Sequence, residues 1–135
     1  MGEYMNWVNI VGLLALVQML VFGYLVGHAR QKYGVKAPAM SGHPVFEAWF
    51  RVQANSVEMA IVFLPALWLA ARYWRPGYAA LVGAVYLVGR IVYAQGYVKD
   101  PGKRGTGFMI SFVAVAVLII VALSGAVREL LASGA

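Results

Sequence analysis

The chain has 135 residues, of which 62% are hydrophobic and only 12% are charged. A water-soluble domain carries about twice that share of charged residues, so the composition indicates a membrane protein, and the length indicates a single domain spanning residues 1–135. The net charge of +6 is spread between long apolar runs, which argues for basic membrane-surface loops and against nucleic-acid binding. Because the sequence has no cysteine, disulfides, thiolate metal sites and a cysteine nucleophile are excluded.

Four segments are long enough to cross a hydrocarbon core of about 30 Å as helices. They cover residues 7–28, 44–73, 77–97 and 107–131. The apolar residues run continuously and do not alternate, so helices are expected and not the strands of a barrel. No basic residue precedes the first segment, and we expect it to be kept as a helix and not removed as a signal peptide. The predicted fold is an all-α integral membrane four-helix bundle.

The connections between these segments differ in charge. The first and third connections, with the residues next to them, hold Arg30, Lys32, Lys36, Lys99, Lys103 and Arg104, and the opposite side of the membrane would hold Arg72, Arg75 and Arg128. The positive-inside rule therefore places the first and third connections in the cytoplasm and both termini outside.

The second segment begins with a polar stripe made of Glu47, Arg51, Asn55 and Glu58. At about 100° per residue, these side chains fall within an arc of roughly 80° on one face of a helix. A charged side chain at the centre of a membrane helix costs about 2.5–3.5 kcal/mol on insertion scales, so this face should avoid lipid. The stripe either neutralises charge inside the bundle or binds a polar ligand there.

The third segment has its own polar stripe, in which Tyr86, Arg90, Tyr93 and Tyr97 span roughly 60° of a helix. Arg90 lies well inside the apolar stretch, and we expect it to form a buried structural ion pair with Glu47. Tyr93 and Tyr97 lie near the loop, where interfacial aromatic belts are common. They also lie at the depth of the polar end of the second segment, which favours a shared pocket.

The expected pocket contains both signs of charge. Its basic groups are Arg30, Arg51 and Arg104, and its acidic group is Glu58. A zwitterionic ligand fits this mixture best, because each charged end finds a charge-assisted hydrogen bond. Gln53 lies about 200° from Arg51 on the same helix. If both residues contact one ligand they come from different copies of the chain, and otherwise Gln53 packs against another helix of its own chain.

Metal binding is not expected, because His28 and His43 are separated by a loop and lack ligand spacing. The sequence also lacks a serine-hydrolase set and a phosphate-binding loop.

The polar residues fall into two motifs. The first is Glu47-x-x-x-Arg51-x-Gln53-x-Asn55-x-x-Glu58, with Pro65 later in the same segment. The second is Arg90-x-x-Tyr93-x-Gln95-Gly96-Tyr97, followed by Pro101-x-Lys103-Arg104. Together they resemble the MAPEG family, the membrane-associated proteins in eicosanoid and glutathione metabolism. This family includes microsomal glutathione transferases and cysteinyl-leukotriene synthases, which are four-helix membrane proteins that assemble as trimers.

The resemblance implies a homotrimer that binds glutathione as cosubstrate between subunits, near the cytoplasmic side and without a metal. Transferred by position, one chain would hold glutathione with Arg51, Asn55, Glu58, Tyr93 and Tyr97, and its neighbour would add Arg30 and Gln53. Arg104 would be the catalytic residue, because a guanidinium beside the sulfur stabilises the thiolate without itself losing a proton.

Two positions distinguish branches of the family. Met59 stands where the leukotriene synthases carry a tyrosine that helps to hold glutathione, and Arg104 stands where the lipid-binding, non-catalytic branch lacks an arginine. The resemblance therefore favours a detoxification enzyme that conjugates glutathione to hydrophobic electrophiles or reduces lipid hydroperoxides, taking this second substrate from the bilayer. The short termini and compact loops are typical of bacterial members, in the cytoplasmic membrane with the active site toward the cytoplasm.

Two alternatives remain open. One is a non-catalytic, lipid-binding scaffold of the same family. The other is a small four-helix multidrug transporter, which would use an intramembrane carboxylate but would not need Arg51, Arg90 and Asn55 beside it.

Overall fold

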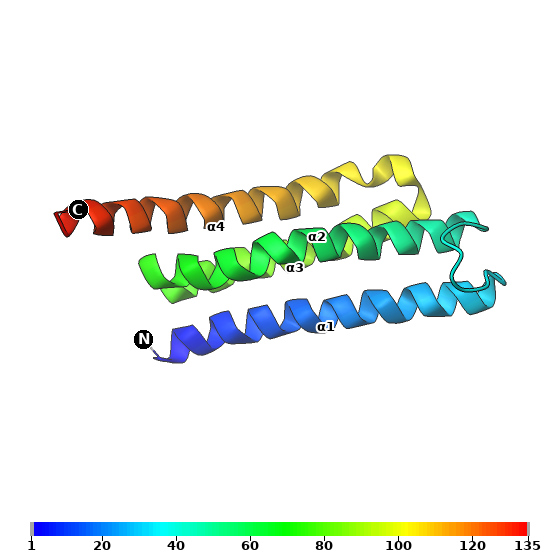
Figure 1. Cartoon of the computed structure of the whole chain (residues 1–135), viewed down its shortest axis with the longest axis horizontal. Coiled ribbons are helices and arrows are strands. Elements are labelled where there is room, and N and C mark those ends of the chain that lie inside the picture. The colour runs from blue at the N-terminus through cyan, green and yellow to red at the C-terminus, as the bar shows by residue number, and fades with distance from the viewer. Residues whose placement is uncertain (1, 135) are drawn as a thin grey trace.

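The computed structural model describes residues 2–134 and shows four long helices joined by short connections (Figure 1). The helices are α1 (Gly2–Lys32), α2 (Pro44–Tyr73), α3 (Pro76–Lys99) and α4 (Gly105–Ala132), and a short 3-10 helix, η1, covers Pro101–Lys103. No strand occurs within the described residues, and the predicted all-α class is confirmed. All four helices are long and apolar enough to cross a membrane.

The outside of the bundle is apolar, as expected for an integral membrane protein. Large apolar side chains are exposed on every helix, among them Leu20, Ile61, Leu81 and Ile120. A surface of this kind would promote aggregation in water, but lipid tails solvate it.

The helices extend beyond the apolar segments because their polar ends reach into the membrane surface. The first predicted segment covers 7–28, whereas α1 runs from Gly2 to Lys32, with Glu3 in its first turn and Arg30 and Lys32 in its last. Charges of these signs are favourable at those ends of the helix dipole. The start of α2 is marked by Pro44 in its first turn and by His43, whose Nδ1 accepts a hydrogen bond from the Val45 N–H at 3.2 Å.

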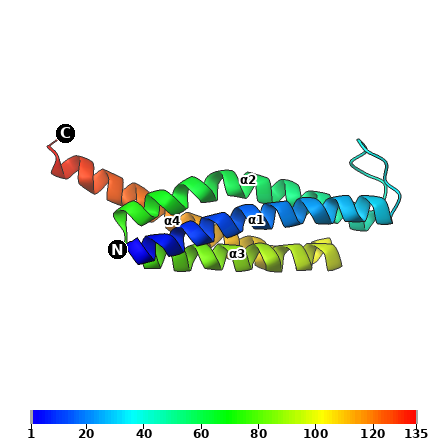
Figure 2. The ribbon, with the colours of Figure 1, turned by 90° about the horizontal axis from the view of Figure 1, so that it is seen from below.

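The bundle has two distinct ends. The connection between α1 and α2 (residues 33–43) and the connection between α3 and α4 (residues 100–104) lie together at one end, which we call the loop end (Figure 1). The short connection between α2 and α3 and both termini lie at the other end, which we call the turn end. Helices α2 and α3 form the centre, and each contacts both α1 and α4. Turning the molecule shows α1 alongside α3, with the last turns of α4 extending beyond the other helices (Figure 2).

The turn-end half has an apolar core. Phe63 of α2 and Tyr86 of α3 stack with ring centroids 3.7 Å apart, and both side chains are almost fully buried. Leu67 and Leu118 are fully buried beside them, and many alanines fill the remaining space. Small residues let membrane helices approach closely, so dispersion contacts accumulate between their backbones.

Two glycines bring α3 and α4 into close contact in the loop-end half. A Cβ atom at Gly107 would overlap the backbone nitrogen of Tyr93, and one at Gly89 would lie 2.7 Å from the backbone nitrogen of Ser111. Neither position has room for a side chain, so the two helices pack more closely than any other residue would allow. This close packing places the buried residues Tyr93 of α3 and Ser111 of α4 at the contact between the two helices.

Candidate functional site

A buried layer of polar side chains crosses the loop-end half and is centred on Arg90 of α3. The Arg90 side chain is 0% exposed. Its Nη1 donates hydrogen bonds to Asn55 Oδ1 at 2.7 Å and to Ser56 Oγ at 3.3 Å, both on α2. Its Nη2 and Nε donate to Ser111 Oγ of α4, at 2.7 and 3.2 Å. Its Cζ lies 4.3 Å from the centroid of the Tyr93 ring. These five residues are called the Arg90 layer.

Ser111 completes the hydrogen bonding of this layer. Its buried hydroxyl accepts both bonds from Arg90 and lies 2.9 Å from the carbonyl oxygen of Gly107 and 3.1 Å from that of Phe108. A serine hydroxyl has one hydrogen to donate and two lone pairs to accept with, so all its capacity is used here. The guanidinium is therefore held by neutral groups from two neighbouring helices, α2 and α4.

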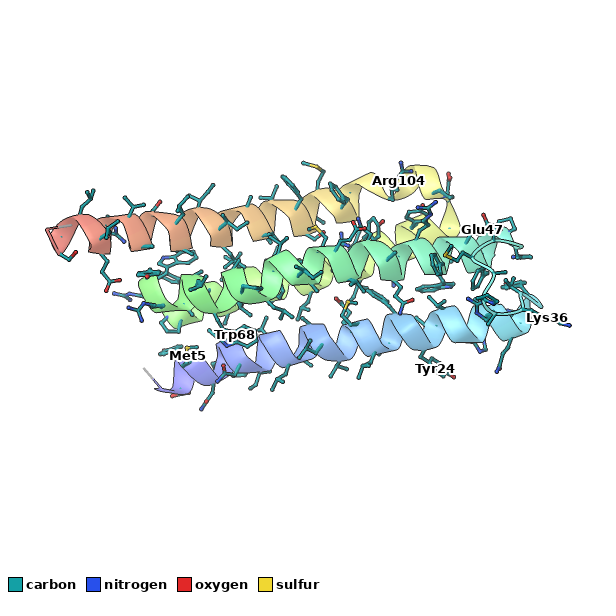
Figure 3. All side chains as sticks on the ribbon, in the orientation of Figure 1. Met5, Tyr24, Lys36, Glu47, Trp68 and Arg104 are labelled. Carbon is teal, nitrogen blue, oxygen red and sulfur yellow. The ribbon has the colours of Figure 1, made fainter. Side chains whose placement is uncertain are left out.

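The expected ion pair between Glu47 and Arg90 is wrong. Glu47 is exposed at the loop end of α2, where it accepts a hydrogen bond from the Gly42 N–H at 3.1 Å (Figure 3). It precedes Asn55 by eight residues, which is about 12 Å along a helix axis, and Asn55 is the residue level with Arg90. Within residues 2–134 the one ion pair joins Arg72 and Glu129 at 3.7 Å, on the surface. The charge of Arg90 has no carboxylate beside it.

A small open pocket lies next to the Arg90 layer at the loop end. Its volume is about 240 Å³, and it is lined by Asn55, Tyr93, Arg104, Gly105 and Phe108. Asn55, Tyr93 and Arg104, predicted from the sequence as site residues, are thus brought together by three different parts of the chain. Tyr97 extends this wall, since its ring meets that of Tyr93 edge-on with centroids 5.6 Å apart.

Arg104 is exposed at the junction of η1 and α4 (Figure 3). Its Nη1 donates to the carbonyl oxygen of Pro101 at 2.6 Å, and its Cζ lies 5.8 Å from the Tyr97 ring centroid. Because Arg104 is also the N-cap residue of α4, its charge adds to the positive end of that helix dipole. This mouth of the pocket favours an anion.

Glu58 and Arg51 lie on the exposed surface of α2. Glu58 follows Asn55 by three residues, so it lies one turn further along α2 on the same face of the helix. Neither Glu58 nor Arg51 lines the pocket described for the single chain, and both are open to a ligand or to another molecule.

Gln53 and Arg30 face other parts of their own chain. The Gln53 amide nitrogen lies 3.0 Å from where a Cβ would stand on Gly23, so Gln53 packs against α1. Arg30 secures the first connection, because its Nη1 donates to the carbonyl oxygen of Ala39 at 2.8 Å and its Cζ lies 4.6 Å from the Phe46 ring centroid. A single chain therefore does not bring these two residues to the pocket.

Ser56 and Ser111 are the polar residues of the site region that the sequence did not single out. Their signal is weak, because a serine in a membrane helix satisfies itself by bonding to its own backbone, as Ser111 does with Gly107. Met59 is half-buried and packs against the apolar core of the turn-end half. Within residues 2–134, no three histidine or acidic side chains gather closely enough to hold a metal ion.

The sequence of this chain is similar to those of known proteins. Residues 8–124 match the model of the MAPEG family. Microsomal glutathione S-transferase 2 of Homo sapiens is 39% identical over 121 residues, which are 90% of this chain and 82% of that protein. Leukotriene C4 synthase of Bos taurus is 35% identical over 121 residues, 90% of this chain and 81% of that protein. An uncharacterised protein of Synechocystis sp. is 44% identical over 117 residues, 87% of this chain and 85% of that protein.

Proposed function

Because the chain belongs to the MAPEG family, we propose that it is a membrane-bound enzyme that conjugates glutathione to hydrophobic electrophiles or uses it to reduce lipid hydroperoxides. One observation carries the proposal: an exposed arginine at the start of a helix shares an open pocket with Asn55 and Tyr93. The names of two relatives, a glutathione transferase and a leukotriene synthase, support the same chemistry.

Arg104 supplies the electrostatic part of catalysis. A free thiol has a pKa of about 8.5, and each unit by which that pKa falls corresponds to about 1.4 kcal/mol of extra stabilisation of the thiolate. The guanidinium and the N-terminus of α4 provide positive charge where the sulfur would lie. The thiol proton leaves to solvent, because an arginine does not accept it.

The bond changes follow from the thiolate. Its sulfur attacks an electrophilic carbon, the new C–S bond forms, and the leaving group departs with its electron pair. With a hydroperoxide, sulfur attacks the terminal oxygen, an alcohol leaves after taking up a proton, and a second glutathione reduces the oxidised sulfur to give a disulfide and water. Both reactions begin from one ionised cosubstrate beside Arg104.

A neighbouring chain completes this site in the proposed homotrimer. A pocket of about 240 Å³ is below the range of about 300–1,000 Å³ that ligand sites usually have. In the proposed assembly, Arg51, Glu58 and Tyr97 of one chain extend the site beyond this pocket, and Arg30 and Gln53 reach the ligand from the next chain. The hydrogen bonds of Arg30 to the first connection use only Nη1, which leaves Nε and Nη2 as donors for glutathione.

The second substrate comes from the bilayer, and the basic residues determine which way the protein is oriented in it. The apolar outside of the helices lets a lipophilic molecule reach the loop end from the lipid. Six of the basic residues lie near this end of the bundle, Arg30, Lys32, Lys36, Lys99, Lys103 and Arg104. The loop end therefore faces the cytoplasm, in a bacterial cytoplasmic membrane, where glutathione in solution meets the lipophilic substrate.

The decisive experiment measures glutathione thiolate on purified protein in detergent, by its ultraviolet absorbance, together with binding by calorimetry. We expect Arg104→Ala to keep most of the affinity and to lose the thiolate signal, whereas Arg51→Ala weakens binding itself. Arg128→Ala, an exposed arginine near the turn end, is the matched control and changes neither. An unchanged thiolate signal in Arg104→Ala would remove Arg104 from the mechanism.

The mass of the purified complex tests the assembly, and we expect three chains. A trimer that binds glutathione but neither conjugates an aromatic electrophile nor reduces a hydroperoxide would contradict the proposed enzyme and favour the non-catalytic scaffold.

A further inference from the structure

Arg90 is buried without a countercharge. All its partners, Asn55, Ser56, Ser111 and the Tyr93 ring, are uncharged. Removing a guanidinium from water costs several kcal/mol even when it is paired, and a neutral side chain would hold helices together at lower cost. Charged residues kept inside membrane bundles generally serve function. Arg90 lies next to the pocket, behind Asn55, and this position indicates a function in ligand binding.

Arg90 determines which way the Asn55 amide points. The oxygen and nitrogen ends of an asparagine amide are nearly the same size, so packing alone selects neither orientation. A guanidinium has only donors, and Arg90 Nη1 lies 2.7 Å from the Asn55 side chain. The atom at that position must be the carbonyl oxygen. The NH₂ group of Asn55 is then turned away from Arg90.

Asn55 lies between Arg90 and the pocket. Its side chain is half-buried and lines the pocket, whereas Arg90 is fully buried behind it. With its oxygen bonded to the guanidinium, the amide offers a hydrogen-bond donor to whatever occupies the pocket. The same guanidinium lies 4.3 Å from the Tyr93 ring centroid, and this cation–π contact holds the second wall of the pocket in place.

We infer that Arg90 is a positioning residue for the ligand site: it presents the Asn55 NH₂ group to an acceptor oxygen of the ligand, and its uncompensated charge favours a ligand of net negative charge. This inference rests on the proposed function, in which the acceptor is a carboxylate or peptide carbonyl oxygen of glutathione. Glutathione has two carboxylates and one ammonium group. Its net charge is therefore negative, opposite to the uncompensated positive charge of the Arg90 layer.

The sharpest test is Asn55→Asp, which has nearly the same shape. A carboxylate forms an ion pair with Arg90, so thermal stability in detergent should be equal to or above that of the wild type. The atom facing the pocket becomes an acceptor oxygen, and glutathione affinity should fall at least about tenfold. A structural role alone predicts that affinity is kept when stability is kept. Unchanged affinity in this variant would overturn the inference.

Asn9→Asp is the matched control. Asn9 Oδ1 also accepts a hydrogen bond, from Trp68 Nε1 at 2.9 Å, but in the turn-end half. This exchange keeps the acceptor oxygen and lies far from the pocket, so glutathione affinity should not change. A fall in affinity equal to that of Asn55→Asp would show a general effect of added negative charge and would also overturn the inference.

A pair of Arg90 variants provides the second measurement if Asn55→Asp is not recovered folded. Lysine keeps a charged donor for the Asn55 oxygen, whereas methionine has a similar length and no donor. We expect Arg90→Met to raise the KM for glutathione at least about tenfold while kcat changes less, and Arg90→Lys to recover part of the loss. Equal KM values in folded Arg90→Met and the wild type would contradict the inference. Wild-type protein that binds no glutathione would instead refute the proposed function.

Discussion

Apolar clusters occur in both halves of the bundle, but the two halves differ in what lies at their centre. In the turn-end half, Phe63 stacks on Tyr86 and alanines fill the remaining space. In the loop-end half, the centre is a guanidinium whose hydrogen bonds reach α2 and α4. Apolar contacts are non-directional and stabilise a packing without orienting polar groups. In the half that carries the pocket, directional hydrogen bonds at the centre fix the orientation of polar groups. The apolar centre of one half therefore mainly determines stability, and the polar centre of the other mainly determines the geometry of the site.

The largest expected effect is a loss of stability in the turn-end half. Phe63→Ala removes a fully buried ring and its stacking with Tyr86, which should lower the free energy of unfolding by about 3 kcal/mol. Reversible unfolding in mixed detergent and dodecyl sulfate measures this change. Ile61→Ala, on the same helix but 70% exposed, should cost much less. Glutathione affinity of folded Phe63→Ala should equal that of the wild type, and a large loss would break the separation of the two halves.

A smaller effect on stability, joined to an effect on binding, is expected from Gly107→Ala. The new methyl group overlaps the backbone of Tyr93, so α3 and α4 must move apart at a cost of about 2 kcal/mol. Tyr93 and Ser111 move with them, and glutathione affinity measured by calorimetry should fall. Gly27→Ala, where the added group meets open space on α1, should leave binding unchanged and stability equal or higher. Full affinity in Gly107→Ala would show that the pocket tolerates separation of α3 and α4.

Trp68→Phe tests whether a polar contact in the turn-end half is only structural. The change removes the hydrogen bond of Trp68 Nε1 to Asn9 Oδ1, which joins α2 to α1. Such bonds between membrane helices contribute about 1 kcal/mol or less, and the thermal midpoint should fall slightly. Trp7→Phe, at an exposed position, is the control. An altered KM for glutathione in Trp68→Phe would contradict a purely structural role.

The smallest effect is expected at the surface. Arg72 and Glu129 form an ion pair at 3.7 Å with both side chains more than half exposed, and such pairs contribute little. Glu129→Gln should leave unfolding and activity unchanged at low and high salt. A measurable loss would mean that charge pairing stabilises this bundle after all, and would weaken the contrast with Arg90.

The helices were predictable because membrane thickness sets a minimum apolar length, which four segments of this sequence meet. The ends of the helices were harder to predict, because local groups such as Glu3 and His43 determine where a helix begins. The error at Glu47 came from assuming that opposite charges pair wherever two stripes face each other. Two side chains pair only if they lie at the same depth along the bundle. Asn55 and Ser111 are the residues at the depth of Arg90.

The pocket was predicted in part for the same physical reason. Asn55, Tyr93 and Arg104 are conspicuous because polar groups are rare in or beside membrane helices, and the structure brings them together. Ser111 was missed because a serine that bonds to its own helix is tolerated anywhere in a bundle. The roles of Arg30 and Gln53 depend on a neighbouring chain, and contacts within one chain do not determine them.

The three-helix span of the Arg90 layer has a consequence for how the bundle assembles in lipid. Helices that insert separately can slide against one another with little change in apolar contact, because lipid tails solvate leucine as well as a neighbouring helix does. A slip of α4 by one residue moves Ser111 by about 1.5 Å along the axis and about 100° around it, and both of its bonds to Arg90 break. A bundle misaligned in this way leaves Nε and Nη2 of the buried Arg90 without acceptors, and this penalty disfavours it before any ligand binds.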